Sequence, residues 1–193
     1  MIPRKPRETH IALDIETNGT LFDCGIWEIG LAIQQIEDGC VVNVTPTSYE
    51  FKVKPLNQLG DDETMQWLEQ QGRLHDYFDA IQHGDQTDVT LQTIKTLIDT
   101  EVATAQGNNP EEHESLFWSW RQFDYPRLEY TFKEVGITHP WKYWQTIDVS
   151  GLHRYAPEIQ RPQSTHFGRE DAKETLRCGV MTHNLLHARL SGS

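Results

Sequence analysis

The strongest constraint on the fold is an alternating pattern near the N-terminus. Residues 10–16 read HIALDIE, with isoleucine or leucine at the odd positions and Asp14 and Glu16 among the even ones. This is the period of a β-strand, in which successive side chains point to opposite faces. The segment therefore predicts a first strand with one apolar face and two carboxylates on the other.

The segments that follow predict an antiparallel start to the fold. Trp27, Ile29, Leu31 and Ile33 repeat the alternation, and after the polar turn 37–39 the segments 41–44 and 49–53 again read as strand. Beyond Pro55 the spacing becomes helical over 64–71, 76–83 and 88–105.

The second half predicts alternating strands and helices. We expect a buried strand at 116–120, a helix from Asp124 that ends at Gly136, a short strand at 143–147 and a last helix over 164–190. Together the segments predict an α/β fold, a mixed five-stranded sheet with three antiparallel N-terminal strands, flanked by helices. The length of 193 residues favours one domain, assigned to 1–190, with 191–193 as a disordered tail.

Composition excludes several classes of protein. No apolar run approaches the roughly 20 residues of a membrane-spanning helix, and none follows the basic residues 3–7 as a signal peptide requires. We therefore expect a cytoplasmic protein with no membrane partner. The net charge of −12 argues against an electrostatic clamp on long duplex DNA, but not against a site whose carboxylates hold divalent cations.

Asp14 and Glu16 are the first candidate site residues. They lie two apart on one strand face, with Cα atoms about 6.6 Å apart, so their carboxylates can share a cation. The Asp-x-Glu spacing also occurs at Asp61 and Glu63 and at Asp99 and Glu101, where a solvated surface is the simpler interpretation because those segments are helical or polar.

Two further candidates lie near expected helix starts. His166 precedes Asp171 by five residues at a loop-to-helix junction, so both can reach one site, although a histidine there can also be structural. Asp124 follows Phe123 at the start of the helix, where it can serve either the site or as a helix N-cap.

The order of these motifs resembles the DEDDh superfamily of 3′-5′ exonucleases, which have a ribonuclease H-like fold and include RNase T and oligoribonuclease. The first motif, Asp14-Ile-Glu-Thr-Asn-Gly-Thr20, is most similar to that of the DexA-like exonucleases of bacteria and phages. The chain departs from the family pattern in the bulky segment 119–122 before Phe123 and in the segment 149–151 after Asp148.

The resemblance implies a two-metal mechanism. Asp14 would bridge two Mg²⁺ or Mn²⁺ ions, Glu16 and Asp171 would complete one of them, and Asp124 would support the other. His166 would accept the proton of the attacking water. The backbone near Ile15 and Thr17 would meet the terminal nucleotide, and Phe123 would either stack on a base or belong to the core. The basic residues near these motifs, which either bind phosphate or are ordinary surface charges, are Arg121, Arg169, Lys173 and Arg177.

The predicted function is therefore metal-dependent 3′-5′ exonuclease activity on the ends of single-stranded RNA or DNA, in a protein that can form a homodimer. Two alternatives stay open: a catalytically silent relative that binds a nucleic-acid end or a protein, and a metal-dependent nucleotide phosphohydrolase.

Overall fold

A mixed β-sheet forms the centre of the protein. The computed structural model describes residues 6–21, 23–42, 45–121, 123–160 and 164–191. Its strands are β1 (Arg7–Thr17), β2 (Ile26–Glu37), β3 (Cys40–Val41), β4 (Thr47–Lys54), β5 (Asp85–Gln86), β6 (His113–Ser119) and β7 (Thr146–Asp148). The strand order in the described part of the chain is β5-β4-β2-β1-β6-β7, and β3 pairs with β2. Strands β1, β2 and β4 are antiparallel, whereas β6 runs parallel to β1 and to β7.

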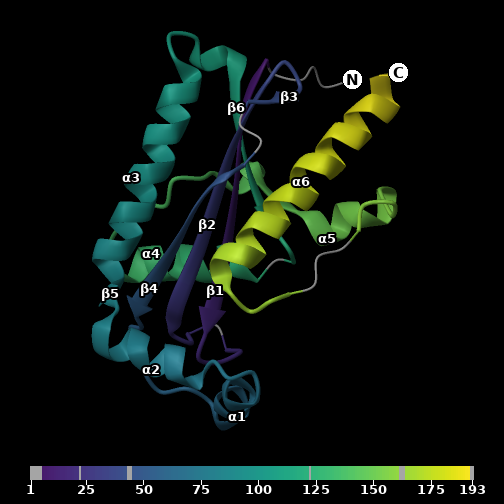
Figure 1. Ribbon diagram of the computed structural model, residues 1–193. Coiled ribbons are helices and arrows are strands. Elements are labelled where there is room, and N and C mark those ends of the chain that lie inside the picture. The colour runs from purple at the N-terminus through teal and green to yellow at the C-terminus, as the bar shows by residue number, and fades with distance from the viewer. Residues whose placement is uncertain (1–5, 22, 43–44, 122, 161–163, 192–193) are drawn as a thin grey trace.

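Helices cover both faces of this sheet. They are α1 (Asp62–Gln70), α2 (Leu74–His83), α3 (Thr87–Gln106), α4 (Asp124–Glu134), α5 (Val149–Leu152) and α6 (Gly168–Ser191). Figure 1 shows α3 on one side of the strands and α6 on the other, with α1 and α2 gathered at one end of the sheet. Among the described residues, no helix is both long and apolar enough to cross a bilayer.

Strand β1 separates the two halves of the core, as its alternation predicts. Ile11, Leu13 and Ile15 pack with apolar residues of α3 and α4. Ala12, on the other face, belongs to a second cluster with Ala172 of α6. The face that carries Asp14 and Glu16 is therefore covered by α6 instead of being open to water along its length.

Small residues let α6 approach the sheet closely. A Cβ on Gly30 of β2 would lie 1.9 Å from the carbonyl carbon of Gly168, and a Cβ on Gly179 would lie 2.5 Å from the ring of Trp118. Since no side chain fits at either contact, glycine at these positions fixes where α6 starts and how it crosses β1 and β2.

The mixed α/β fold with three antiparallel N-terminal strands is confirmed. The described sheet has two strands more than the predicted five, the two-residue strands β3 and β5. The segment predicted at 41–44 overlaps β3, whereas β5 is too short to leave a periodic signal. Residues 43–44 of one predicted strand lie outside the described residues.

The last helix begins at Gly168, four residues later than predicted, because residues 164–166 wrap around the side chain of Asp171. Gly136, at a φ of 74°, follows the end of α4 as expected. Helix α6 continues to Ser191, the first residue of the predicted tail, and residues 192–193 lie outside the described part, so the tail and the single-domain boundary stay predictions.

Candidate active site

The end of β1, the start of α4 and the segment before α6 meet at one pocket of about 310 Å³. Its lining includes all five residues that the sequence predicted as catalytic: Asp14, Glu16, Asp124, His166 and Asp171. Three segments that are far apart in the sequence thus contribute to a single site.

Asp14 and Glu16 reach the pocket because β1 places both on the face toward α6. Burial raises the pKa of Asp14 well above its ordinary value, and the charges of Asp124 and Glu16 raise it further. Burial also raises the pKa of Glu16 to about 8, and the neighbouring Glu28 adds to the shift. Both carboxyl groups are therefore costly to ionise without a cation beside them.

Asp124 occupies the first turn of α4 and is buried. Its Oδ1 accepts a hydrogen bond from the backbone N–H of Ile15 at 3.3 Å, which connects the start of α4 to strand β1. Burial raises the pKa of Asp124 to about 7, partly opposed by this hydrogen bond. The N-cap alternative is wrong for Asp124, because the N-cap position belongs to Phe123.

Asp171 holds the segment before α6 in place. Its oxygens accept hydrogen bonds from the Ser164 hydroxyl at 2.7 Å, from the Thr165 N–H and hydroxyl at 2.8 Å each, and from the His166 N–H at 3.0 Å. A carboxylate has about four lone-pair sites, so these four donors occupy them. Asp171 can ligate a cation only by releasing one of these donors.

His166 sits at the turn that Asp171 organises. Its φ of 57° is unusual for a residue with a side chain. The imidazole meets the ring of Trp67, from α1, in an edge contact with centroids 4.6 Å apart, and its Nδ1 lies 3.3 Å from the Ser164 hydroxyl. Packing from α1 and the turn geometry together aim the ring into the pocket.

The chemistry of the donor set fits a divalent cation. Glu16, His166 and Asp171 each offer a ligand atom, and these three atoms lie within 4.8 Å of one another. Asp124, which is buried, and Asp14, which is half-buried, add two carboxylates to the same pocket. Oxygen-rich sites suit Mg²⁺ and Mn²⁺, and a bound cation would remove the repulsion that raises the carboxyl pKa values.

A second pocket of about 360 Å³ adjoins the first, and Ile15, Glu16 and Phe123 line both. Thr17 and Trp67 also line this second pocket. The Ile15 N–H is engaged with Asp124. The prediction that Phe123 belongs to the core is wrong, because this residue is 39% exposed. The guanidinium of Arg127 lies over its ring, 3.4 Å from the centroid.

The four basic candidates differ in their partners. Arg169 and Lys173 pair with Glu170, and Arg177 pairs with Glu174. Arg121 lines the pocket at a φ of 74°, with its N–H donating to Asp148 at 3.0 Å. Within the described ranges no ion pair involves the Arg121 guanidinium, so this residue is the best placed of the four to meet a phosphate.

Sequence reasoning missed three residues around His166: Trp67, Glu28 and Arg73. Glu28 is the direct cross-strand neighbour of Glu16 in the β1–β2 register and is 1% exposed. The signal was present, since Glu28 interrupts an alternating apolar strand just as Asp14 and Glu16 do. Nothing local in the sequence marks Trp67 or Arg73, because only the packing of α1 and α2 brings them to the site.

The mixed sheet with its flanking helices has a ribonuclease H-like fold, and acidic residues converge on one pocket at the edge of that sheet. The family model for the 3′-5′ exoribonuclease Rv2179c-like domain matches residues 9–189. The chain belongs to that family and is therefore a hydrolase of the exonuclease type.

Solved structures agree with the fold. The Mg²⁺- and Mn²⁺-bound form of Pop2p from S. pombe is similar with a TM-score of 0.56 and 16% identity, over 95% of this chain and 85% of that one. Cell-death related nuclease 4 (CRN-4) is similar with a TM-score of 0.50 and 14% identity, over 97% of this chain and 65% of that one. No curated protein matches the sequence.

Proposed function

We propose that this domain removes nucleotides one at a time from the 3′ end of single-stranded RNA or DNA, using two divalent metal ions. The observation that carries the proposal is the convergence of four carboxylates and one histidine on a single pocket. The family description favours RNA as the substrate.

Asp14, Glu16, Asp124 and Asp171 would hold two Mg²⁺ or Mn²⁺ ions. When bound, such a pair lowers the pKa of water and neutralises charge on the phosphate oxygens. The solved Pop2p structure is described as a Mg²⁺- and Mn²⁺-bound form, which supports divalent-cation binding by a protein of this fold. The raised pKa values of Asp14, Glu16 and Asp124 support the same assignment.

His166 would accept the proton of the attacking water, since its ring points into the pocket beside Glu16 and Asp171. An imidazole suits this role because its ordinary pKa lies close to neutral pH. Phe123 and Trp67 line the adjoining pocket and offer ring faces or edges for the terminal base, while Thr17 and the Ile15 backbone would border the sugar. Arg121 would contact the phosphate next in the chain.

Short single strands suit this site better than duplexes. With a net charge of −12, the protein can neutralise few phosphates, so binding should be weak and should depend little on salt. A log–log salt slope steeper than about −5 would contradict this expectation, because it implies five or more displaced counterions. The homodimer and the cytoplasmic location stay predictions.

The deciding experiment incubates the pure protein and Mn²⁺ with 5′-labelled RNA or DNA oligonucleotides of one sequence. Stepwise shortening from the 3′ end, release of mononucleotides and loss of activity in EDTA support the proposal. Nicking of a circular single strand contradicts it. Binding without cleavage would favour the catalytically silent relative, and turnover of a nucleoside triphosphate alone would favour the phosphohydrolase.

A further inference from the structure

A buried ion pair lies directly behind the turn that carries His166. Glu28 Oε1 accepts a hydrogen bond from the Gly168 N–H at 2.7 Å, and Glu28 Oε2 accepts one from Arg73 Nη2, also at 2.7 Å. Both side chains are almost fully buried, at 2% exposure for Glu28 and 5% for Arg73. The pair therefore connects strand β2, the start of α2 and the first residue of α6.

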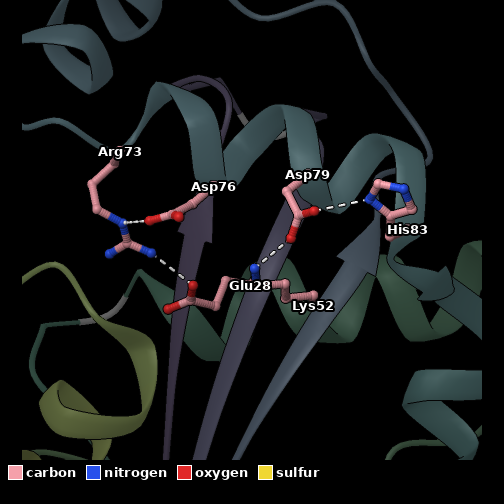
Figure 2. Close-up of polar contacts among 6 residues, drawn as sticks. All are labelled: Glu28, Lys52, Arg73, Asp76, Asp79 and His83. Carbon is pink, nitrogen blue, oxygen red and sulfur yellow. Dashed lines mark hydrogen bonds and ion pairs between the residues drawn. The ribbon is translucent and has the colours of Figure 1, made fainter.

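Arg73 also contacts the turn at 166–168 directly, through the flat face of its guanidinium. Its guanidinium lies over the ring of Phe167 at 4.1 Å and over the ring of Trp27 at 5.0 Å. Its Nε donates to Asp76 at 2.6 Å, which orients the guanidinium plane. Figure 2 shows Arg73 reaching from α2 toward Glu28 on the sheet while it also contacts Asp76.

These contacts fix both residues that follow His166, while Asp171 fixes the residues that precede it. Phe167 is held by Arg73, and Gly168 is held by Glu28 and by its close approach to Gly30. His166 itself is in the left-handed region at a φ of 57°, a conformation that needs support from its surroundings. The imidazole on such a turn keeps its orientation only if both flanking segments stay in place.

We propose that Glu28 and Arg73 are positioning residues that hold the turn at 166–168 and so aim the His166 imidazole into the active site. The proposal rests on the function proposed above for His166. Neither residue lines the pocket, so they act through the backbone and ring of their neighbours and not through contact with substrate.

The same helix offers a matched control. Asp79 of α2 accepts hydrogen bonds from Lys52 of β4 at 2.5 Å and from His83 at 2.9 Å. Figure 2 shows this trio beside the Arg73–Glu28 pair, farther along α2. It also joins α2 to the sheet and also touches a histidine ring, but it makes no contact with the turn at 166–168 among the interactions of the described residues.

The test compares Glu28→Gln with Asp79→Asn by NMR of the ring signals of His166 and His83. Glutamine keeps an acceptor for Gly168 but turns an NH₂ donor toward the Arg73 donor. We expect Glu28→Gln to shift or broaden the His166 signal and leave that of His83 in place. Asp79→Asn should do the reverse. His166→Gln and His83→Gln assign the two signals among the nine histidines.

Activity gives the second readout, through a double-mutant cycle. Glu28→Gln should lower kcat by about 10- to 10²-fold with KM within about twofold of wild type, since misaimed groups slow the chemical step more than binding. In the His166→Ala background, Glu28→Gln should cause no further loss, because the group it positions is absent. Asp79→Asn should leave kcat near that of wild type in both backgrounds.

Arg73→Lys is the second variant should Glu28→Gln fail to fold. Lysine keeps the charge but has neither a flat face for Phe167 nor a second nitrogen for Asp76. It should move the His166 signal and lower kcat in the same way. An unchanged His166 signal in both variants, or losses that multiply in the cycle, would overturn the positioning role. A wild-type protein without nuclease activity would refute the proposed function, and the NMR comparison would still decide the positioning role.

Discussion

Strand β1 carries two acidic clusters at its opposite ends, and both face helix α6. One contains Glu8, His10 and His183, and the other contains Glu16, His166 and Asp171. In each cluster the three ligand atoms lie within 4.8 Å of one another. By residue type alone, the two are equally plausible metal sites.

The hydrogen bonds of the first cluster argue against a metal there. Trp118 Nε1 can only donate, and it lies 3.0 Å from His10 Nδ1, so His10 Nδ1 is an acceptor and the proton is on Nε2. This Nε2 donates to Glu8 Oε2 at 2.9 Å, and His183 Nε2 lies 3.4 Å from Glu8 Oε1. A metal on His10 would have to displace a proton that is already shared with a carboxylate.

The second cluster differs from the first in the charge of the groups around its carboxylates. Burial and then the charges of Glu28, Asp171 and Asp124 raise the carboxyl pKa of Glu16 to about 8, although Arg73 opposes the shift. Glu8 instead is bonded to histidine nitrogens. The comparison teaches that the neighbours of a carboxylate, and not its proximity to histidine, separate a ligand site from a structural cluster.

The largest effect should come from Asp14→Asn. If Asp14 ligates metal, cleavage should fall to background while the metal-free protein keeps its melting temperature or gains slightly, because one of several mutually repelling carboxyl groups is removed. Added Mn²⁺ should then raise the melting temperature of wild type more than that of the variant. If Asp14→Asn lowers the metal-free melting temperature and responds to Mn²⁺ as wild type does, Asp14 is not a metal ligand.

His166→Ala should lower kcat by about 10²- to 10⁴-fold, the usual contribution of a general base. Mn²⁺ binding, measured by calorimetry, should largely survive, since Mg²⁺ and Mn²⁺ prefer the oxygen ligands that remain. A variant with wild-type turnover would make His166 a structural residue, like His10 in the other cluster.

Glu8→Gln should behave in the opposite way to Asp14→Asn. Removing the charge that His10 and His183 share should lower the free energy of unfolding by about 1 to 3 kcal/mol. Turnover at saturating RNA and Mn²⁺ should stay close to that of wild type. Denaturant unfolding and initial rates on the same preparations measure both. A loss of turnover without loss of stability would mean that the first cluster is functional after all.

The metal-free protein should lose stability as the pH rises from about 4 to about 8. Glu16 and Asp124 have pKa values of about 8 and about 7 in the folded state. The ordinary values are about 4.3 and 3.9. The folded state therefore retains protons that the unfolded state has released, so this stabilisation is full below pH 4 and is lost through pH 7 to 8.

Melting temperatures in EDTA across this pH range check the sign of the effect. Asp14→Asn should flatten the decline, because it removes a charge that raises the pKa of its neighbours, whereas Glu8→Gln should not. Saturating Mn²⁺ should reduce or reverse the decline, since the cation binds the ionised carboxylates. A metal-free stability that increases with pH would contradict the electrostatic account of the site.

The smallest effect should come from Arg121→Ala. Loss of an exposed phosphate contact should raise KM for a short oligonucleotide by about twofold to fivefold, the range of an exposed ion pair, with little change in kcat. Lys173→Ala is the matched control, because the Lys173 ammonium is already paired with Glu170. Equal effects of both variants would remove Arg121 from the substrate contacts.

The sequence by itself determined the elements and the residues of the site. The alternation at 10–16 fixed which side chains of β1 share a face, because the strand period is a local property of the backbone. The motif order then led to all four carboxylates and His166, which line one pocket. The two-residue strand β5 and the four-residue helix α5 left no local pattern long enough to read.

Only the tertiary structure decided how those residues are supported. Asp124 accepts a hydrogen bond from the Ile15 N–H, and Arg73 meets Glu28 behind His166. Both contacts join residues that are far apart in the sequence. It also decided how the two acidic clusters differ in their hydrogen bonds and surrounding charges, since Glu8 and Glu16 look alike in the sequence. The physical reason is that a pKa or a tautomer depends on which groups surround an atom, and in this protein those groups come from distant strands and helices.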